Sequence, residues 1–240
     1  MVRIQLWDLP TRVFHWSLAA LVVASFATGW SGGNAMEWHG RAGVAIIGLL
    51  AFRLIWGFVG STHARFGRFV RGPAAIAGYL RGSWSGVGHN PLGALSVLAM
   101  LALLLCQAIG GLFANDDIAF NGPYFAAISK DLSDWITGWH KRGSWLILVL
   151  VGLHLAAILF HTLVRKQKLI PPMLTGTKEV PETLAGEAAR GGGPAAFGVA
   201  LALGLAAAWA AGGALLPAPP VQATDQGVAP AAKPPANTNW

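Results

Sequence analysis

The sequence predicts an all-α protein built from membrane-spanning helices. Apolar residues make up 54% of the 240 residues and charged residues only 11%, whereas a typical soluble domain is about 25% charged. The apolar residues gather in five runs, each near the roughly 20 helical residues that cross a bilayer core of about 30 Å. Five runs of this length leave too little polar sequence to cover them as buried helices of a soluble protein.

The runs are separated by Gly, Pro, Asn and charged residues, which are typical of loops. We do not expect the first run to be a cleaved signal peptide, because it is long and no small-x-small cleavage site follows it. The five predicted spans are Val13–Trp30, Ala42–Gly60, Leu92–Phe113, Ser144–Val164 and Ala195–Leu216.

Cysteine usage and motifs exclude several classes of protein. The single cysteine, Cys106, lies inside the third run, which excludes an intramolecular disulfide, a CxxC redox pair and a cysteine-ligated iron–sulfur cluster. The sequence has no GxGxxG or P-loop nucleotide signature. The net charge of +7 raises the question of nucleic-acid binding, but the distribution of the charge argues against it.

The basic residues indicate the orientation of the chain. With the N-terminus inside, the cytoplasmic segments are 1–12, 53–91 and 165–194, and they hold most of the 17 Lys and Arg residues. This bias predicts a multi-pass membrane protein with a cytoplasmic N-terminus and an extracytoplasmic C-terminus. The surplus charge is then expected to meet anionic lipid head groups. We expect the Pro/Ala-rich residues 217–240 to form an extracytoplasmic tail.

Two similar motifs place histidines at one depth of the membrane. "EWHGRAG" at 37–43 and "GWHKRGS" at 138–144 precede the second and fourth runs, which cross from outside to inside. His39 and His140 therefore begin their helices near the outer interface. A histidine in a membrane helix is costly without a partner, and two facing imidazoles can hold haem through its iron.

A second pair of histidines is predicted near the inner side. His154 follows His140 by 14 residues, which is about 21 Å along a helix and within roughly 40° of the same face. His15, in "RVFHWSL", lies at a similar depth on the first helix. His161 competes with His154 as the partner of His15. Two histidines at each of two depths predict two haem sites.

Basic and aromatic residues extend the candidate sites. Arg53, in "LLAFRLIWG", is expected at the inner depth, where a guanidinium in lipid needs an anion such as a haem propionate. Arg41 and Arg142 could serve the outer haem in the same way, or extend to lipid head groups. His89, in "GHNPLG", could touch a propionate or a quinone, or simply lie at the interface. A quinone is expected near the inner haem, beside His89, Arg53 and Trp16.

The motifs "RVFHW", "WHGRAG…RLIWG" and "WHKRGSWLILVLVGLHLAAILFH" resemble the bacterial cytochrome b561 / nickel–iron hydrogenase b-type cytochrome family over roughly residues 5–175. The resemblance implies a transmembrane four-helix bundle that holds two b haems, the outer one on His39 and His140 and the inner one on His15 and His154. The expected organisation is a dihaem domain (1–175), a cytoplasmic linker (176–194), a fifth transmembrane helix (195–216) and the tail (217–240).

The resemblance also implies a function. Members of the family pass electrons between a periplasmic protein, such as a hydrogenase or a c-type cytochrome, and membrane quinone. We therefore expect an electron-transfer subunit rather than an independent catalyst, and assign no catalytic residue. Two alternatives stay open: a stand-alone superoxide:quinone oxidoreductase, and a haem-free transporter or scaffold. The sequence also leaves open whether the bundle forms a homo-oligomer.

Overall fold

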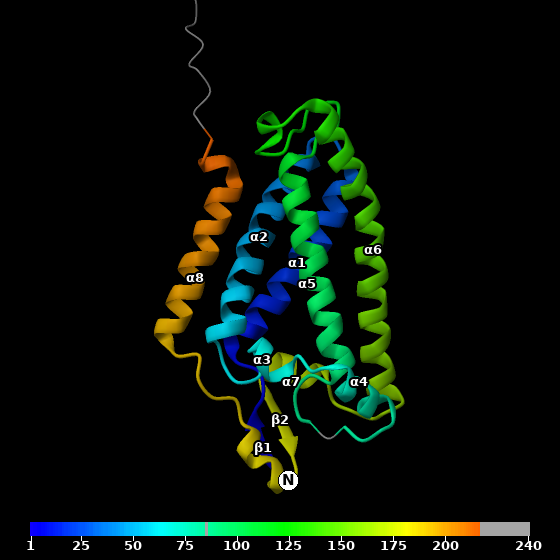
Figure 1. Ribbon diagram of the computed structural model, residues 1–240, viewed down its shortest axis with the longest axis vertical. Coiled ribbons are helices and arrows are strands. Elements are labelled where there is room, and N and C mark those ends of the chain that lie inside the picture. Colours follow the sequence, from blue (N-terminus) through cyan, green and yellow to red (C-terminus); the bar gives the residue numbers. More distant parts are fainter. Residues whose placement is uncertain (85, 217–240) are drawn as a thin grey trace, which may run out of the picture.

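The computed structural model describes residues 1–84 and 86–216 of the chain, so the predicted tail at 217–240 lies outside the described residues. Four long helices form a bundle, and a fifth lies beside it against α2 (Figure 1). The four helices of the bundle are each long and apolar enough to cross a membrane, and so is the fifth together with the helical turn that continues it, Pro194–Ala214. This confirms the predicted all-α membrane fold. The helices are α1 (Leu9–Ser31), α2 (Ala35–Val59), α5 (Pro91–Phe113), α6 (Lys130–Leu163) and α8 (Pro194–Trp209).

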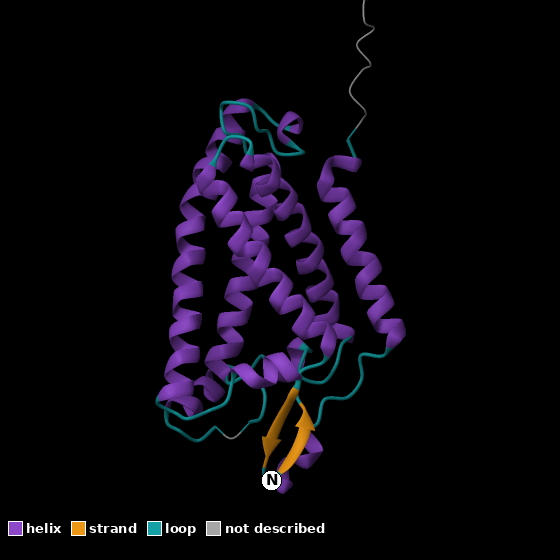
Figure 2. Cartoon of the chain, turned by 180° about the vertical axis from the view of Figure 1, so that it is seen from behind, coloured by secondary structure: helices purple, strands orange, loops and turns teal. Residues whose placement is uncertain are grey.

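The two ends of the bundle differ in structure, as the view from behind also shows (Figure 2). We call the end with the α5–α6 connection the upper end, and the end with the N-terminus the lower end, as drawn in Figure 1. The upper end carries the short helix η1 (Phe125–Ala127) and the π-helical turn η3 (Ala210–Ala214) that continues α8. The lower end carries α3 (Phe66–Phe69), α4 (Pro73–Leu80), α7 (Ile170–Thr175), η2 (Glu182–Glu187) and two strands.

The two strands form a small sheet below the bundle. β1 (Val2–Gln5) pairs antiparallel with β2 (Thr177–Val180), with Val2 opposite Val180. Ile4, Leu6 and Val180 are buried with Trp7 in a small apolar cluster under the sheet. The segment expected as a linker at 176–194 therefore contains a strand and η2. Four-residue strands are too short for alternation of apolar and polar residues to reveal them.

Side-chain caps set where the helices begin. Asp8 caps α1 by accepting a hydrogen bond from the backbone N–H of Thr11 at 2.6 Å, and Asn90 caps α5 in the same way. Ser129 caps α6, which therefore begins 14 residues before the expected Ser144. The hydropathy pattern missed this extension because its first turns are polar. His140 consequently lies well inside a continuous helix rather than at its start.

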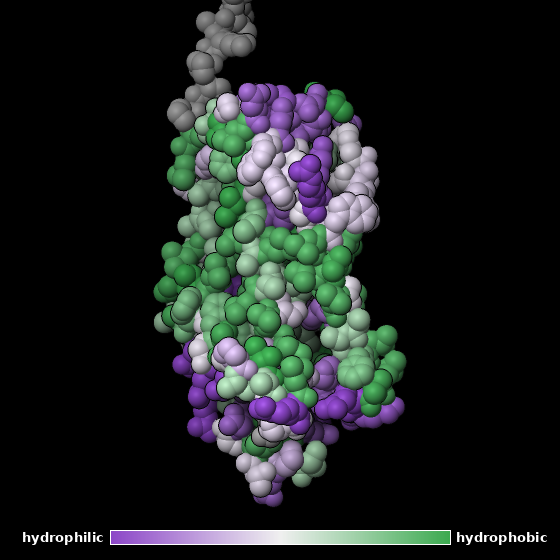
Figure 3. Space-filling view, turned by 45° about the vertical axis from the view of Figure 1, so that its right-hand side comes forward, coloured by the Kyte–Doolittle hydropathy of each residue, from purple (hydrophilic) through white to green (hydrophobic). Residues whose placement is uncertain are grey.

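The surface has the pattern of a membrane protein. Figure 3 shows an apolar band across the middle of the molecule, with polar residues gathered at both ends. Exposed tryptophans mark the upper end of the band, where aromatic belts meet lipid head groups. They are Trp30, Trp38, Trp135, Trp139, Trp145 and Trp209.

Helix α8 packs closely on α2 through small residues. A Cβ atom added to Gly48 of α2 would lie 2.9 Å from Cβ of Ala208 and 3.1 Å from the carbonyl oxygen of Gly204. One added to Gly204 would lie 2.8 Å from the carbonyl oxygen of Gly48. Ala200, one turn away, is fully buried. Such contacts let two membrane helices approach backbone to backbone.

Substituting Gly204 by leucine is expected to separate α8 from α2, because the new side chain would meet the backbone of Gly48. Overpacking of this kind costs about 1–3 kcal/mol, so the thermal midpoint of the detergent-solubilised protein should fall. Gly198→Leu is the matched control, since a Cβ there meets nothing within 4 Å. Equal midpoints for the two variants would contradict the close packing of these helices.

Candidate functional site

Two histidines face each other near the upper end of the bundle. His39 of α2 and His140 of α6 have ring centres 6.0 Å apart, with the ring planes at 85°. Nδ1 of His39 lies 2.8 Å from the carbonyl oxygen of Ser25, and Nδ1 of His140 lies 3.0 Å from that of Gln107. A carbonyl only accepts hydrogen bonds, so Nδ1 donates in both residues. This leaves each Nε2 with a free lone pair, as in metal-ligating histidines.

A second pair lies toward the lower end. His15 of α1 and His154 of α6 have ring centres 6.5 Å apart, with the planes at 49°. Nδ1 of His15 is buried and has no hydrogen-bond partner among the described residues. The edge of Trp16 lies against His15, with ring centres 5.0 Å apart. The 14-residue spacing of His140 and His154 on one helix separates the two pairs by about 21 Å.

The spacing within each pair fits one iron between two imidazoles. A metal–nitrogen bond to histidine is about 2.0 Å long, and the nitrogen lies roughly 1.2 Å from its ring centre, so two trans imidazoles have centres about 6.4 Å apart. The observed distances of 6.0 and 6.5 Å bracket this value. In residues 1–84 and 86–216, no three His, Cys, Asp or Glu side chains converge to hold a metal ion alone. Each pair thus offers two histidine nitrogens at a spacing that suits one metal ion.

A cavity of about 510 Å³ lies beside the upper pair, with His39 and His140 among its lining residues. Its walls come from α1, α2, α5, α6 and the α1–α2 and α5–α6 connections. A Cβ atom at Gly43, which also lines it, would meet nothing within 4 Å. Gly29 and Gly111 instead lie against the two imidazoles, at 3.0 Å from His39 Nδ1 and 3.2 Å from His140 Cε1 for an added Cβ. These glycines leave room for a flat group between the helices.

Arg53 lies buried in the lower half of the bundle. Its side chain is 3% exposed and stacks over Phe66, with the guanidinium carbon 4.8 Å from the ring centre. Its Nη1 has no hydrogen-bond partner among the described residues. Asp8 is the acid that interacts with it electrostatically, and it also accepts a hydrogen bond from Nε1 of Trp56 at 3.1 Å. Asp8 was not among the predicted site residues, although an aspartate before Leu-Pro in "WDLP" is typical of a helix N-cap.

His89 lies at the lower end between two aromatic rings. The ring centres of Trp7 and Phe69 are each 4.7 Å from that of His89. Its Nδ1 is buried and has no partner in the described part of the chain. Burial lowers the pKa of His89 to about 3, and the positive charge of Arg53 acts in the same direction. The imidazole is therefore neutral at physiological pH, with a polar atom free for a ligand.

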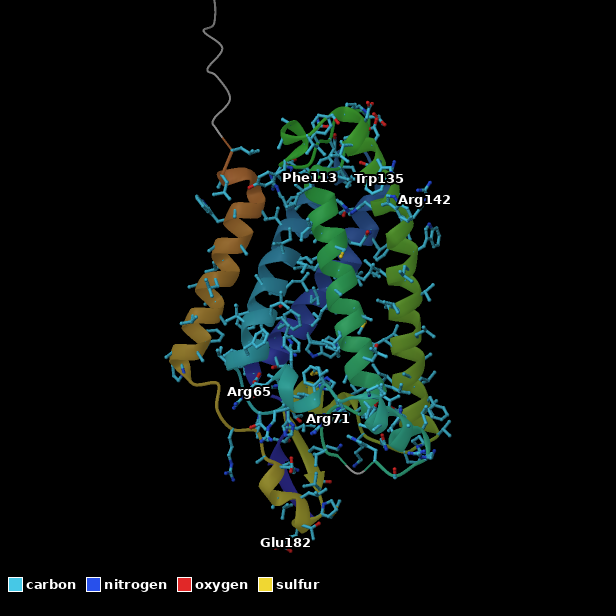
Figure 4. All side chains as sticks on the ribbon, viewed as in Figure 1. Arg65, Arg71, Phe113, Trp135, Arg142 and Glu182 are labelled. Atoms are coloured by element: carbon cyan, nitrogen blue, oxygen red, sulfur yellow. The ribbon has the colours of Figure 1, made fainter. Side chains whose placement is uncertain are left out.

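The other three predicted residues are Arg41, Arg142 and Trp16. Arg41 pairs with Glu37 on the surface of α2. Arg142 lies over Trp139 and points away from the bundle in Figure 4. Neither arginine lines the upper cavity, whereas Lys141, which lies between His140 and Arg142 in the sequence, does. Trp16 is half exposed, and its Nε1 donates to the carbonyl oxygen of Met173 at 3.2 Å.

The geometry also separates His154 from His161. The structure places His154 opposite His15, whereas His161 lies two turns farther down α6. Nε2 of His161 lies 3.2 Å from the hydroxyl of Tyr79, and Nδ1 lies 3.0 Å from Oε1 of Gln167. Both nitrogens of His161 are thus engaged, which favours His154 as the partner of His15.

Comparison with known proteins gives an independent result. The family model described as prokaryotic cytochrome b561 matches residues 6–176. A protein named probable Ni/Fe-hydrogenase B-type cytochrome subunit from Rhizobium leguminosarum bv. viciae is 26% identical over 211 residues, covering 73% of this chain and 88% of the relative. A protein of the same name from Azotobacter chroococcum mcd 1 is 27% identical over 217 residues, covering 72% and 87%. No solved structure matches the chain.

Proposed function

Since the chain belongs to the prokaryotic cytochrome b561 family, whose model matches residues 6–176, we propose that it binds two b haems and carries electrons across the membrane. The proposed electron path runs between an extracytoplasmic redox protein and membrane quinone. The observation that carries this proposal is the pair of imidazole distances, 6.0 Å at the upper site and 6.5 Å at the lower site.

In the proposal, His39 and His140 hold the upper haem, and His15 and His154 hold the lower one. The haem iron supplies one-electron oxidation and reduction at a potential that ligation, burial and hydrogen bonding tune. The hydrogen bonds from Nδ1 to backbone carbonyls orient the upper imidazoles and raise the basicity of Nε2. A haem held by both histidines of a pair would have no position left for oxygen, which favours electron transfer over oxygen chemistry.

Arg53 and His89 serve the lower site in this proposal. Both carry a buried polar atom without a partner among the described residues, and a haem propionate would supply the missing acceptor for Arg53. We place the quinone at the same end, beside His89 and Trp16, because the half-exposed ring of Trp16 borders the lipid. Arg41 and Arg142 stay predicted contacts of the upper haem, with less geometric support.

We propose that the lower end faces the cytoplasm of the bacterial inner membrane. Its short connections carry most of the arginines, as the positive-inside rule requires. The upper end then faces the periplasm and its redox partner. The names of the relatives favour a hydrogenase as that partner, with a c-type cytochrome as the other option. Residues 1–175 form the dihaem domain, and α8 is an addition to it.

Proteoliposomes test the proposed electron path. Vesicles are loaded with ferricyanide, and an impermeant reductant is added outside. The wild-type chain should reduce the trapped ferricyanide, whereas His15→Leu, which lacks one lower ligand, should not. Equal rates in the wild type and His15→Leu would contradict a path that uses both sites. Empty vesicles measure the leak of the reductant.

Gly43→Leu is expected to displace the upper haem. The new side chain would enter the open space of the upper cavity, where Gly43 now has no neighbour within 4 Å of its Cβ position. Haem content should fall from two to one per chain when measured from the pyridine haemochrome spectrum. Gly198→Leu, on the exposed side of α8, should keep both haems. Two haems in Gly43→Leu would show that this cavity is not the haem site.

A further inference from the structure

Two connections between helices help to line the upper cavity: the short one between α1 and α2, and the longer one between α5 and α6. We call the longer connection, residues 114–129, the upper loop. It crosses the upper end of the bundle and reaches toward the end of α8 (Figures 1 and 2). The loop residues that line the cavity are Ala114, Asn115, Asp116, Ile118, Phe120 and Pro123.

The upper loop is held by hydrogen bonds within itself and by hydrogen bonds to α6. Oδ1 of Asp116 accepts hydrogen bonds from the backbone N–H groups of residues 118, 119 and 120, at 2.8–3.0 Å. Asn115 is buried and donates through Nδ2 to Ser133 Oγ at 2.7 Å and to Asp134 Oδ1 at 2.8 Å, both on α6. These bonds tie one end of the loop to α6.

The upper loop contacts α2, the helix that carries His39. The ring of Phe120 stands over Gly40, where an added Cβ would lie 2.9 Å from two ring carbons. Gly40 directly follows His39 in α2. The upper loop therefore covers the space beside the imidazole of His39 at the upper end of the bundle.

The far side of the loop is attached to α8. The hydroxyl of Tyr124 donates to the carbonyl oxygen of Ala210 at 2.6 Å, and Pro123 lies 3.5 Å from the Cβ position of Gly213. Ala210 begins the π-helical turn η3, and Gly213 has a φ of +89° that ends the regular helix. A backbone carbonyl oxygen has two lone pairs, so that of Ala210 can accept from the tyrosine hydroxyl even within a helical turn.

From these contacts we propose that α8 is a brace for the upper loop, and that Tyr124 is the positioning residue through which the brace keeps the upper cavity covered. Helix α8 lies outside residues 6–176, which the family model matches, so this role belongs to the added segment of this chain. That the covered space holds a haem rests on the proposed function. The brace itself is a contact within the protein and can be tested separately.

Cysteine labelling tests the brace. Ala114 lines the cavity and is 8% exposed, so Ala114→Cys in a Cys106→Ser background reports opening of the loop to a hydrophilic, impermeant maleimide. Adding Tyr124→Phe to the full-length reporter keeps the ring but removes the hydroxyl. The labelling rate should rise roughly fivefold, the change in an opening equilibrium that follows loss of one typical, partly buried hydrogen bond. An unchanged rate would overturn the proposal.

The chain offers a matched control in its other tyrosine. Tyr79 donates or accepts one hydrogen bond with His161 at the lower end, so Tyr79→Phe should leave the labelling rate unchanged. A similar rise in both variants would show general loosening and would also overturn the brace. Unchanged size-exclusion elution of each variant verifies that it is folded.

A redox titration separates positioning from a merely structural role. In the His154→Ala background, where only the upper haem is expected, Tyr124→Phe should shift the midpoint potential, because water admitted to the cavity favours the more charged ferric iron. In the His140→Ala background, which keeps only the lower haem, Tyr124→Phe should cause no shift. Equal shifts in both backgrounds would overturn the positioning role. If the chain bound no haem, the proposed function would be wrong. The labelling comparison would still test whether α8 holds the upper loop through Tyr124.

Discussion

Replacing His140 by alanine is expected to remove one haem from the chain and leave the other in place. His140 faces His39 at a distance that fits a shared iron, and one remaining imidazole cannot fill both axial positions. The haem content should fall from two to one per chain by pyridine haemochrome. Electron transfer into proteoliposomes should drop by at least about a hundredfold, because loss of an outer-shell partner alone costs roughly 10–100-fold and this variant loses a ligand.

Two further variants make this result specific. His154→Ala should remove the lower haem, so that its remaining spectrum differs from that of His140→Ala. His161→Ala should keep both haems, because both nitrogens of His161 are engaged by Tyr79 and Gln167. Loss of a haem in His161→Ala, or full haem content in His140→Ala, would refute the ligand assignment.

Replacing Arg53 by glutamine is expected to lower the midpoint potential of the lower haem. A buried positive charge favours the ferrous state over the more positive ferric state, and Arg53 is 3% exposed. One unit charge acting over roughly 8 Å at an effective dielectric constant near 20 contributes about 2 kcal/mol. For a one-electron couple this corresponds to a fall of about 90 mV. Spectroelectrochemical titration resolves the two haems.

The controls for Arg53 separate charge from folding. Arg53→Lys keeps the charge and should recover most of the potential, although lysine cannot bind bidentately. Arg142→Gln removes an exposed arginine that lies over Trp139 and should leave the lower potential unchanged. If Arg53→Gln instead moved the upper potential alone, the placement of Arg53 at the lower site would be wrong.

The levels of the histidines could be predicted from the sequence because a helix has a fixed rise. The spacing of His140 and His154 fixes two depths on one face of α6, and His39 and His15 then pair with them in the structure. The apolar runs likewise predicted the five long helices. The depths of the histidines depend only on the rise of a helix, and the five helices depend only on local composition. Neither prediction needs knowledge of contacts between distant segments.

Contacts between distant segments could not be predicted in this way. Asp8 approaches Arg53 and Trp56 only because α1 and α2 pack together. The strand pairing of residues 2–5 with 177–180 joins the two ends of the family core. Tyr124 donates a hydrogen bond to Ala210, which lies 86 residues farther along the chain in the π-helical turn that continues α8. None of these contacts leaves a periodic signal in the sequence.

The most direct test is to count and characterise the haems of the purified wild-type chain. Iron and pyridine haemochrome assays should give two b haems per chain, both low-spin in the oxidised and reduced states. Carbon monoxide should leave the reduced spectrum unchanged, because two imidazoles occupy each iron. A single haem per chain, or a spectrum that carbon monoxide alters, would show that the four histidines do not act as two ligand pairs.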